Sequence, residues 1–153
     1  LAELIMAGET MKEGMKVLEP HLKARDVKPL GKIVIGTVRG DLHDIGKNIA
    51  ATLLRSAGFT IIDLGVDVSP ERFVEAVQEN KPDILAMSAL LTTTMIEMEN
   101  TIKALKEAGL RDKVKVIIGG APITPEYAEK IGADAAAKDA VEGVDICKSW
   151  VSK

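Results

Sequence analysis

The sequence predicts an α/β fold, a doubly wound parallel sheet of five strands with helices packed on both faces. From residue 32 onward, short runs rich in β-branched residues alternate with longer segments of helical periodicity, as they do in βαβ units. The first run, residues 32–38, is apolar on both faces, as a strand covered by helices on either side must be. The 153 residues are enough for one compact domain with a core of its own.

Five strands are expected in this part of the chain. Four of the runs are clear, and the fifth is short and rich in alanine. They cover residues 32–38, 60–64, 83–87, 113–118 and 134–137. Because only 3% of the residues are aromatic, aliphatic side chains must form most of the core between these strands and the helices.

The first helix is expected to follow the first strand and to end near Gly58, since glycine commonly terminates a helix. Apolar residues recur in it at helical spacing and predict the stripe that packs on the sheet. That stripe consists of Ile45, Ile49, Leu53 and Leu54.

Four more helices are expected, each after one of the remaining strands. Ser69 and Pro70 supply an N-cap and a first-turn proline for the second helix. Thr124 and Pro125 open the fourth helix in the same way. The residues that should face the core are Phe73 and Val77 in the second helix, Met95, Met98, Ile102 and Leu105 in the third, and Ala140, Val144, Cys147 and Val151 in the fifth.

Residues 1–27 have helical periodicity without strand-like runs and are interpreted as the C-terminal remnant of a helical cap domain. Four apolar residues between positions 11 and 22 share one face of a helix, which is too short to bury that face alone. Residues 28–31 are expected to be a linker, and residues 32–153 the second domain.

Composition and charge exclude several classes of protein. A formal net charge of −3 and the lack of a basic run argue against nucleic acid as a partner. No apolar run approaches the roughly 20 residues that a membrane helix needs. Cys147, the single cysteine, has no partner for an internal disulfide. Without a signal-peptide pattern, we expect a cytoplasmic protein.

A candidate metal ligand follows the first strand. Doubly wound sheets bind ligands at the carboxyl ends of their strands, near the point where the strand order reverses. His43, one of only two histidines, lies in this segment two residues after Asp41. A carboxylate that holds one ring nitrogen fixes the tautomer and leaves the other nitrogen free for a metal. Gly46 has no side chain and leaves room for a bulky group beside it.

Unusual residues also follow the third and fourth strands. Ser88 and the threonines at 92–94 offer hydroxyls that can bond a neighbouring carboxylate or a ligand. Gly119 and Gly120 let an elongated ligand approach the backbone closely. Each feature also has an ordinary explanation: a surface hydrogen-bonded pair, a helix cap and a tight turn. Their coincidence at one edge of the sheet favours a binding site.

These segments together resemble the corrinoid-binding domain of cobalamin-dependent methyltransferases. The family pattern D-x-H-x-x-G … S-x-L … GG is matched at every fixed position, by Asp41, His43, Gly46, Ser88, Leu90, Gly119 and Gly120. Residues 47–87 and 91–118 separate its three parts, spacings typical of that family. The resemblance covers about residues 30–150 and extends to small corrinoid proteins of anaerobic methylotrophic and O-demethylating systems and to the cobalamin domain of methionine synthase.

The resemblance implies a Rossmann-like or flavodoxin-like cobalamin-binding fold and a role for each matching residue. His43 would be the lower axial ligand of cobalt, Asp41 would accept a hydrogen bond from His43, and Ser88 would bond Asp41. The residues that would contact the cofactor or line the slot for its nucleotide tail are Asp41, His43, Asp44, Ile45, Gly46, Ser88, Leu90, Thr92, Gly119, Gly120, Ala121 and Ala136. Ala136 stands where relatives often carry an aromatic residue, which leaves the packing of the tail's base open.

The implied function is that of a methyl carrier rather than a stand-alone enzyme. A cobalamin or related corrinoid would alternate between methyl-Co(III) and Co(I), and the His43–Asp41–Ser88 relay would couple a protonation event to the coordination of cobalt. A substrate-specific methyltransferase would deliver the methyl group, and a second methyltransferase would pass it to a folate or a thiol. The methyl donor, the lower base and the oligomeric state stay open.

Three alternatives share the motif or the fold. The cobalamin-binding subunit of an adenosylcobalamin mutase also uses D-x-H-x-x-G, but the helical remnant favours methyl transfer, because such caps shield the upper face of methyl-cobalt. A cobalamin-sensing regulatory domain would be expected to carry a DNA-binding or signalling segment, and none is evident. A phosphorelay receiver would leave His43 without a role.

Overall fold

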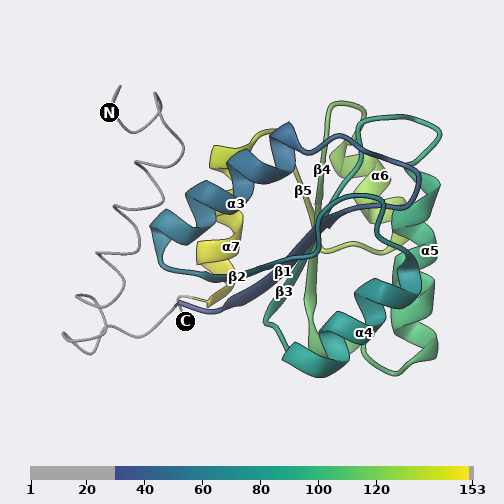
Figure 1. Cartoon of the computed structure of the whole chain (residues 1–153), viewed down its shortest axis with the longest axis horizontal. Coiled ribbons are helices and arrows are strands. Elements are labelled where there is room, and N and C mark those ends of the chain that lie inside the picture. Colours follow the sequence, from purple (N-terminus) through teal and green to yellow (C-terminus); the bar gives the residue numbers. More distant parts are fainter. Residues whose placement is uncertain (1–29, 152–153) are drawn as a thin grey trace.

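Five parallel strands form one sheet in the computed structural model, which describes residues 30–151 (Figure 1). The strand order is β2-β1-β3-β4-β5, so the order reverses between β1 and β3. The strands are β1 (Lys32–Thr37), β2 (Thr60–Asp63), β3 (Ile84–Ser88), β4 (Lys115–Gly119) and β5 (Ala135–Ala137). The predicted five-stranded, doubly wound α/β fold is confirmed, including its short alanine strand.

Helices cover both faces of the sheet (Figure 1). One face packs against α3 (Ile45–Ala57) and α7 (Ala140–Val151), and the other against α4 (Pro70–Asn80), α5 (Ile96–Glu107) and α6 (Pro125–Ile131). A short 3-10 helix, η1 (Arg111–Lys113), lies between α5 and β4.

Local capping explains why two helix starts could be predicted from the sequence. The Ser69 hydroxyl accepts a hydrogen bond from the backbone N–H of Arg72 at 3.1 Å. Thr124 accepts one from the N–H of Tyr127 at 3.1 Å. In both helices a proline takes the first position, where the missing N–H costs nothing.

The core consists of two apolar layers, one on each face of the sheet. The layer under α4, α5 and α6 contains Phe73, Ile102 and Leu105, as predicted. The layer under α3 and α7 contains Leu54 and Cys147. Strand β1 lies between the two layers and is buried from its second residue to its last, which confirms its prediction as a central strand.

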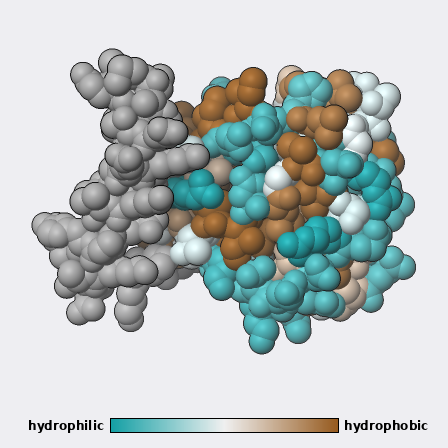
Figure 2. Space-filling model, in the orientation of Figure 1, coloured by the Kyte–Doolittle hydropathy of each residue, from teal (hydrophilic) through white to brown (hydrophobic). Residues whose placement is uncertain are grey.

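The predicted apolar stripe of α3 is wrong at its first two positions. Ile45 is 75% exposed and Ile49 51% exposed, whereas Lys47, Ala51 and Leu54 are buried. The face toward the sheet therefore carries a lysine, which a simple hydrophobic pattern assigns to solvent. Figure 2 shows apolar surface at the top of the molecule, in the region where α3 begins.

The strand register brings three loops together at one edge of the sheet. Thr37 pairs with Ser88, and Ser88 pairs with Gly119. The segments that follow β1, β3 and β4 therefore start side by side, at the point where the strand order reverses. The predicted helical remnant of residues 1–27 and residues 28–29 of the predicted linker lie outside the described residues, so the domain boundaries remain predictions.

Candidate functional site

The imidazole of His43 lies beside the carboxylate of Asp41, as the sequence predicts. Nδ1 of His43 is 2.8 Å from Oδ1 of Asp41, and the His43 backbone N–H donates to the same oxygen at 3.0 Å. The His43 side chain is 52% exposed. Because the ionised carboxylate can only accept a hydrogen bond, Nδ1 of the neutral ring carries the hydrogen and donates it, which leaves a lone pair at Nε2.

The carboxylate of Asp41 is fully buried and heavily hydrogen-bonded. Its second oxygen, Oδ2, accepts bonds from the Leu90 N–H at 2.7 Å and from the Thr94 hydroxyl at 2.8 Å. Burial by itself raises the pKa of Asp41, but the hydrogen bonds from Leu90, His43 and Thr94 outweigh it and hold that pKa well below its usual range. Asp41 is therefore a fixed anion that orients His43.

The predicted bond from Ser88 to Asp41 is not formed, and Thr94 takes that place. Within the described residues the Ser88 hydroxyl has no hydrogen-bond partner, and it lines a cavity instead. A turn closed by the bond from the Thr94 N–H to the Leu91 carbonyl brings the Thr94 hydroxyl over the carboxylate. Three consecutive threonines signalled a hydroxyl function here, but the sequence does not show which of them turns inward.

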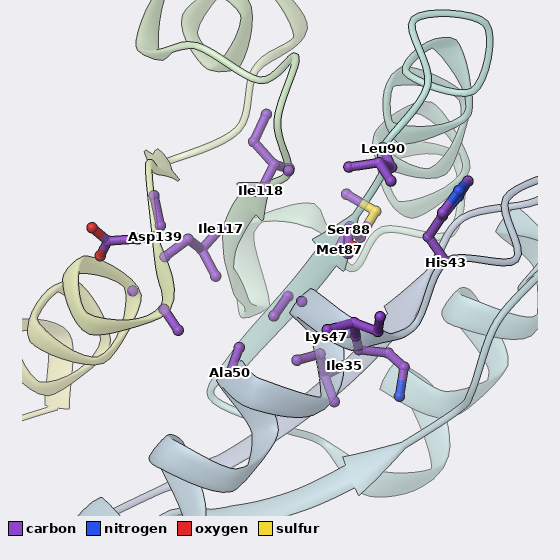
Figure 3. A pocket seen from close by; sticks show the side chains of 18 of the residues that line it. Ile35, His43, Lys47, Ala50, Met87, Ser88, Leu90, Ile117, Ile118 and Asp139 are labelled. Carbon is purple, nitrogen blue, oxygen red and sulfur yellow. The ribbon is translucent and has the colours of Figure 1, made fainter.

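A cavity of about 570 Å³ opens beside His43, between the sheet and helices α3 and α7 (Figure 3). Side chains from β1, β3, β4 and α3 surround it in that view. Nine of the predicted site residues line it: His43, Asp44, Ile45, Gly46, Ser88, Leu90, Gly119, Gly120 and Ala121. A single cavity thus collects the three segments that the sequence analysis selected.

Three predicted site residues do not line this cavity. Asp41 is fully buried and contacts the His43 side chain instead. Ala136 packs toward the opposite layer of the core, and its neighbour Ala137 lines the cavity instead. Successive side chains of a strand point to opposite faces of the sheet, so a prediction that is off by one residue selects a side chain on the wrong face. Thr92 is exposed in the loop after β3 and lies outside the lining.

Two glycines fit the site for different reasons. A Cβ on Gly46 would have no atom within 4 Å, so this position leaves open space beside the cavity. Gly120 has φ +134°, and a Cβ there would overlap the carbonyl oxygen of Ala89. Gly46 therefore leaves the space beside the cavity free. Gly120 is needed because its positive φ and the nearby Ala89 carbonyl exclude a side chain.

A buried ion pair holds the start of α3, and the sequence analysis missed it. The amine of Lys47 lies 2.7 Å and 2.9 Å from the two carboxylate oxygens of Asp63, at the end of β2. The Lys47 side chain is 3% exposed, whereas that of Asp63 is 26% exposed. The charge of the amine is therefore compensated by Asp63, and the Lys47 side chain contributes to the cavity wall.

The inner wall of the cavity is apolar and includes residues of α7 that the sequence analysis did not select. Cys147 is 1% exposed, and burial raises the pKa of its thiol to about 12. The thiol therefore stays neutral and unreactive at physiological pH. This agrees with the prediction that Cys147 faces the core.

His43 is isolated as a metal ligand. The described residues contain no group of three or more His, Cys, Asp or Glu side chains that could hold a metal ion. The described residues therefore offer a metal at His43 no cluster of further protein ligands, and the adjoining cavity has the size of pockets that bind prosthetic groups. No helix of the described residues is long and apolar enough to cross a membrane.

Comparison with known proteins decides the identity of that group. The B12 binding domain family matches residues 31–145. The chain belongs to this family. It is 47% identical to trimethylamine corrinoid protein 2 of Methanosarcina acetivorans, over 99% of this chain and 70% of that protein. The cofactor is a cobalamin or related corrinoid, and the chain is a corrinoid-binding protein of the kind found in methyltransferase systems.

Two solved structures resemble this corrinoid-binding protein over nearly its whole length. A cobalamin-binding protein from Desulfitobacterium hafniense DCB-2 is 44% identical with a TM-score of 0.81, and the match covers 98% of this chain and 70% of that one. The methanol:cobalamin methyltransferase complex of Methanosarcina barkeri contains a chain that is 32% identical with a TM-score of 0.85. That match covers 99% of this chain and 58% of the other.

Proposed function

We propose that this protein carries a methyl group on its corrinoid, with His43 as the lower axial ligand of cobalt. The observation that carries the proposal is the free Nε2 of a half-exposed imidazole whose Nδ1 is held by a buried carboxylate, at the mouth of a large cavity. A bound corrinoid supplies a cobalt ion that accepts a methyl group from one molecule and gives it to another.

The residues present fit such a group. Gly46 leaves the space beside His43 free of side-chain atoms, and the cavity behind it can take an elongated tail. Exposed apolar side chains line the same cavity as the imidazole at Leu42, Ile45 and Leu90, whose exposed fractions are 70%, 75% and 41%. A flat macrocycle over His43 would cover this surface, which explains why a chain of this size leaves it open.

Asp41 and Thr94 control the proton on His43. Asp41 favours the ring tautomer with hydrogen at Nδ1, so that Nε2 would offer its lone pair to a bound metal. If the imidazole were released from a metal, the buried Asp41 carboxylate would stay bonded to Nδ1 and keep the ring oriented. The Thr94 hydroxyl and the Leu90 N–H hold the other carboxylate oxygen and prevent Asp41 from turning away.

The partners in this proposal are two methyltransferases. The similar proteins are named for trimethylamine, and the similar complex for methanol, so we infer a small methylated amine or alcohol as the donor. A first methyltransferase loads the methyl group, and a second delivers it to a folate or a thiol. Both steps are expected to take place in the cytoplasm.

Reconstitution with cobalamin tests the cofactor site. The protein should bind cobalamin and give an absorption spectrum of a form whose own base has been displaced. His43→Ala should alter that spectrum and weaken binding about tenfold or more. His21→Ala, which removes the only other histidine, is the matched control and should leave both unchanged. A spectrum that His43→Ala does not alter would contradict the role of His43.

A transfer assay tests the carrier role itself. The cobalamin-loaded protein, reduced and mixed with a methylamine:corrinoid or methanol:corrinoid methyltransferase, should accept one methyl group per cobalt. It should give that group up when the second methyltransferase and a thiol or folate are added. Activity only with adenosylcobalamin and a mutase partner would instead favour the mutase subunit.

A further inference from the structure

The deep end of the cavity offers a ligand no hydrogen-bonding oxygen or nitrogen from its side chains. We define the deep end by six lining residues that also belong to the core under α3 and α7 or adjoin it: Ile35, Leu54, Ala86, Ile117, Gly143 and Cys147. The labelled Ile35 and Ile117 lie in this part of Figure 3. The only polar group among these side chains is the neutral thiol of Cys147.

The polar side chains that line the cavity belong to less buried residues, except that of Lys47, which already has a partner. Asp44, Lys138 and Asp139 are exposed at the rim. Ser88 ends strand β3, and the Lys47 amine is bonded to Asp63. The backbone groups of the central strands are paired with their neighbours in the sheet, so they offer nothing either. A polar group that enters the deep end therefore loses its hydrogen bonds to water and gains none from the side chains there.

From the apolar lining of the deep end we infer that it selects corrinoids by the lower base of their nucleotide tail. It accepts a benzimidazole or phenol base and discriminates against adenine. The inference rests on the proposed function, in which the displaced nucleotide tail enters the cavity. Adenine brings an amino group and several ring nitrogens that would lose their hydrogen bonds here, and burying such groups unpaired is costly. A benzimidazole exposes one ring nitrogen, and a phenol base exposes none.

The width of the deep end depends on a glycine of α7. A Cβ on Gly143 would lie 3.5 Å from the Cβ of Ala137, an ordinary contact, so the two residues face each other across the cavity wall. A larger side chain at 143 would extend into the space the base needs. Leucine favours helix more than glycine does, so α7 itself would not be weakened.

A binding titration with four corrinoids tests the inference. The single tryptophan, Trp150, lies in α7, and its fluorescence should be quenched when a coloured corrinoid binds nearby. Cobalamin and the cresol-based cobamide should bind at least about tenfold more tightly than the adenine-based cobamide, which corresponds to about 1.4 kcal/mol. Cobinamide, which lacks the nucleotide tail, provides the baseline for binding through the macrocycle alone.

Gly143→Leu should reduce the affinity for cobalamin to nearly that for cobinamide and leave the cobinamide affinity unchanged. Asp145→Leu places the same side chain at an exposed position of α7 and should change neither affinity. Gly143→Ala, with its ordinary contact to Ala137, should fold normally and give an intermediate result. It keeps the test valid if the leucine variant does not fold.

The outcomes separate this inference from the proposed function. Equal affinity for the three tailed corrinoids, or no effect of the Gly143 variants, overturns the selection by the deep end and leaves the proposed function intact. Failure of every corrinoid to bind, cobinamide included, overturns the proposed function and the inference with it.

Discussion

The hydroxyl of Thr94 is one of two hydrogen-bond donors to the buried oxygen Oδ2 of Asp41. Thr94→Val keeps the shape of the side chain and removes that donor. The free energy of unfolding should fall by about 1–3 kcal/mol, because a buried charged acceptor loses a bond. Urea denaturation of the corrinoid-free protein measures this loss.

Ser88→Ala is the control for Thr94→Val, since it removes a hydroxyl from the end of strand β3 without breaking any side-chain hydrogen bond among the described residues. It should change the free energy of unfolding by less than about 0.5 kcal/mol. Equal losses in the two variants would mean that the hydroxyl of Thr94 has no special relation to Asp41.

The lowered pKa of Asp41 predicts a pH dependence of stability. In the unfolded chain this carboxyl titrates near 3.9, and in the folded protein it does so at lower pH. The stabilisation it provides is therefore complete above about pH 4 and is lost as the pH falls through the folded pKa. The difference in unfolding free energy between the wild type and Asp41→Asn should shrink from pH 6 to pH 3. A difference that grows on acidification would contradict the assignment.

At the scale of single elements, we expect the loss of Asp63 from the Lys47–Asp63 pair to cost more stability than the loss of Lys47. Asp63→Asn leaves a lysine that is 3% exposed without its counter-charge, and should cost about 3 kcal/mol of unfolding free energy. Lys47→Met leaves an aspartate that water can still reach, and should cost less. Thermal or urea unfolding of both single variants and the double variant measures the order. The double variant should be more stable than Asp63→Asn alone, and a greater loss in Lys47→Met would refute this explanation.

The turn after β4 gives a further prediction. Gly120→Ala should destabilise the protein by about 1–3 kcal/mol, because a Cβ would overlap the Ala89 carbonyl and the backbone has a positive φ. Gly46→Ala is the comparison, because nothing lies within 4 Å of its Cβ and alanine favours the helix. Its unfolding free energy, measured in urea, should stay the same or rise slightly. If both variants lost stability equally, the explanation for Gly120 would fail.

The elements themselves could be predicted where the signal is local. Ser69 and Thr124 cap their helices next to prolines, and β1 is an uninterrupted apolar run, so these starts and this strand need no tertiary information. The face of α3 could not be predicted, because Lys47 is buried only by virtue of Asp63, sixteen residues later. Hydrophobic periodicity assigns a lysine to solvent and an isoleucine to the core. In α3 the opposite holds: Ile45 and Ile49 are exposed, and Lys47 is buried.

At the scale of the whole molecule, the sheet converts separated motifs into one site. His43, Ser88 and Gly119 meet because the strand order reverses between β1 and β3 and the register aligns the strand ends. That convergence could be predicted from the general rule for doubly wound sheets. The choice of Thr94 over Ser88, and of Ala137 over Ala136, could not, since each depends on which way a single side chain turns.

The central claim is that the imidazole of His43 binds cobalt, and electron paramagnetic resonance of the Co(II) corrinoid tests it most directly. Protein labelled with 15N-histidine and loaded with cobalamin should show the axial nitrogen splitting as a doublet, where unlabelled protein shows a triplet. His43→Ala should abolish the effect of the label, and His21→Ala should preserve it. A splitting that does not respond to labelled histidine would show that no protein imidazole reaches the metal, and would contradict this account.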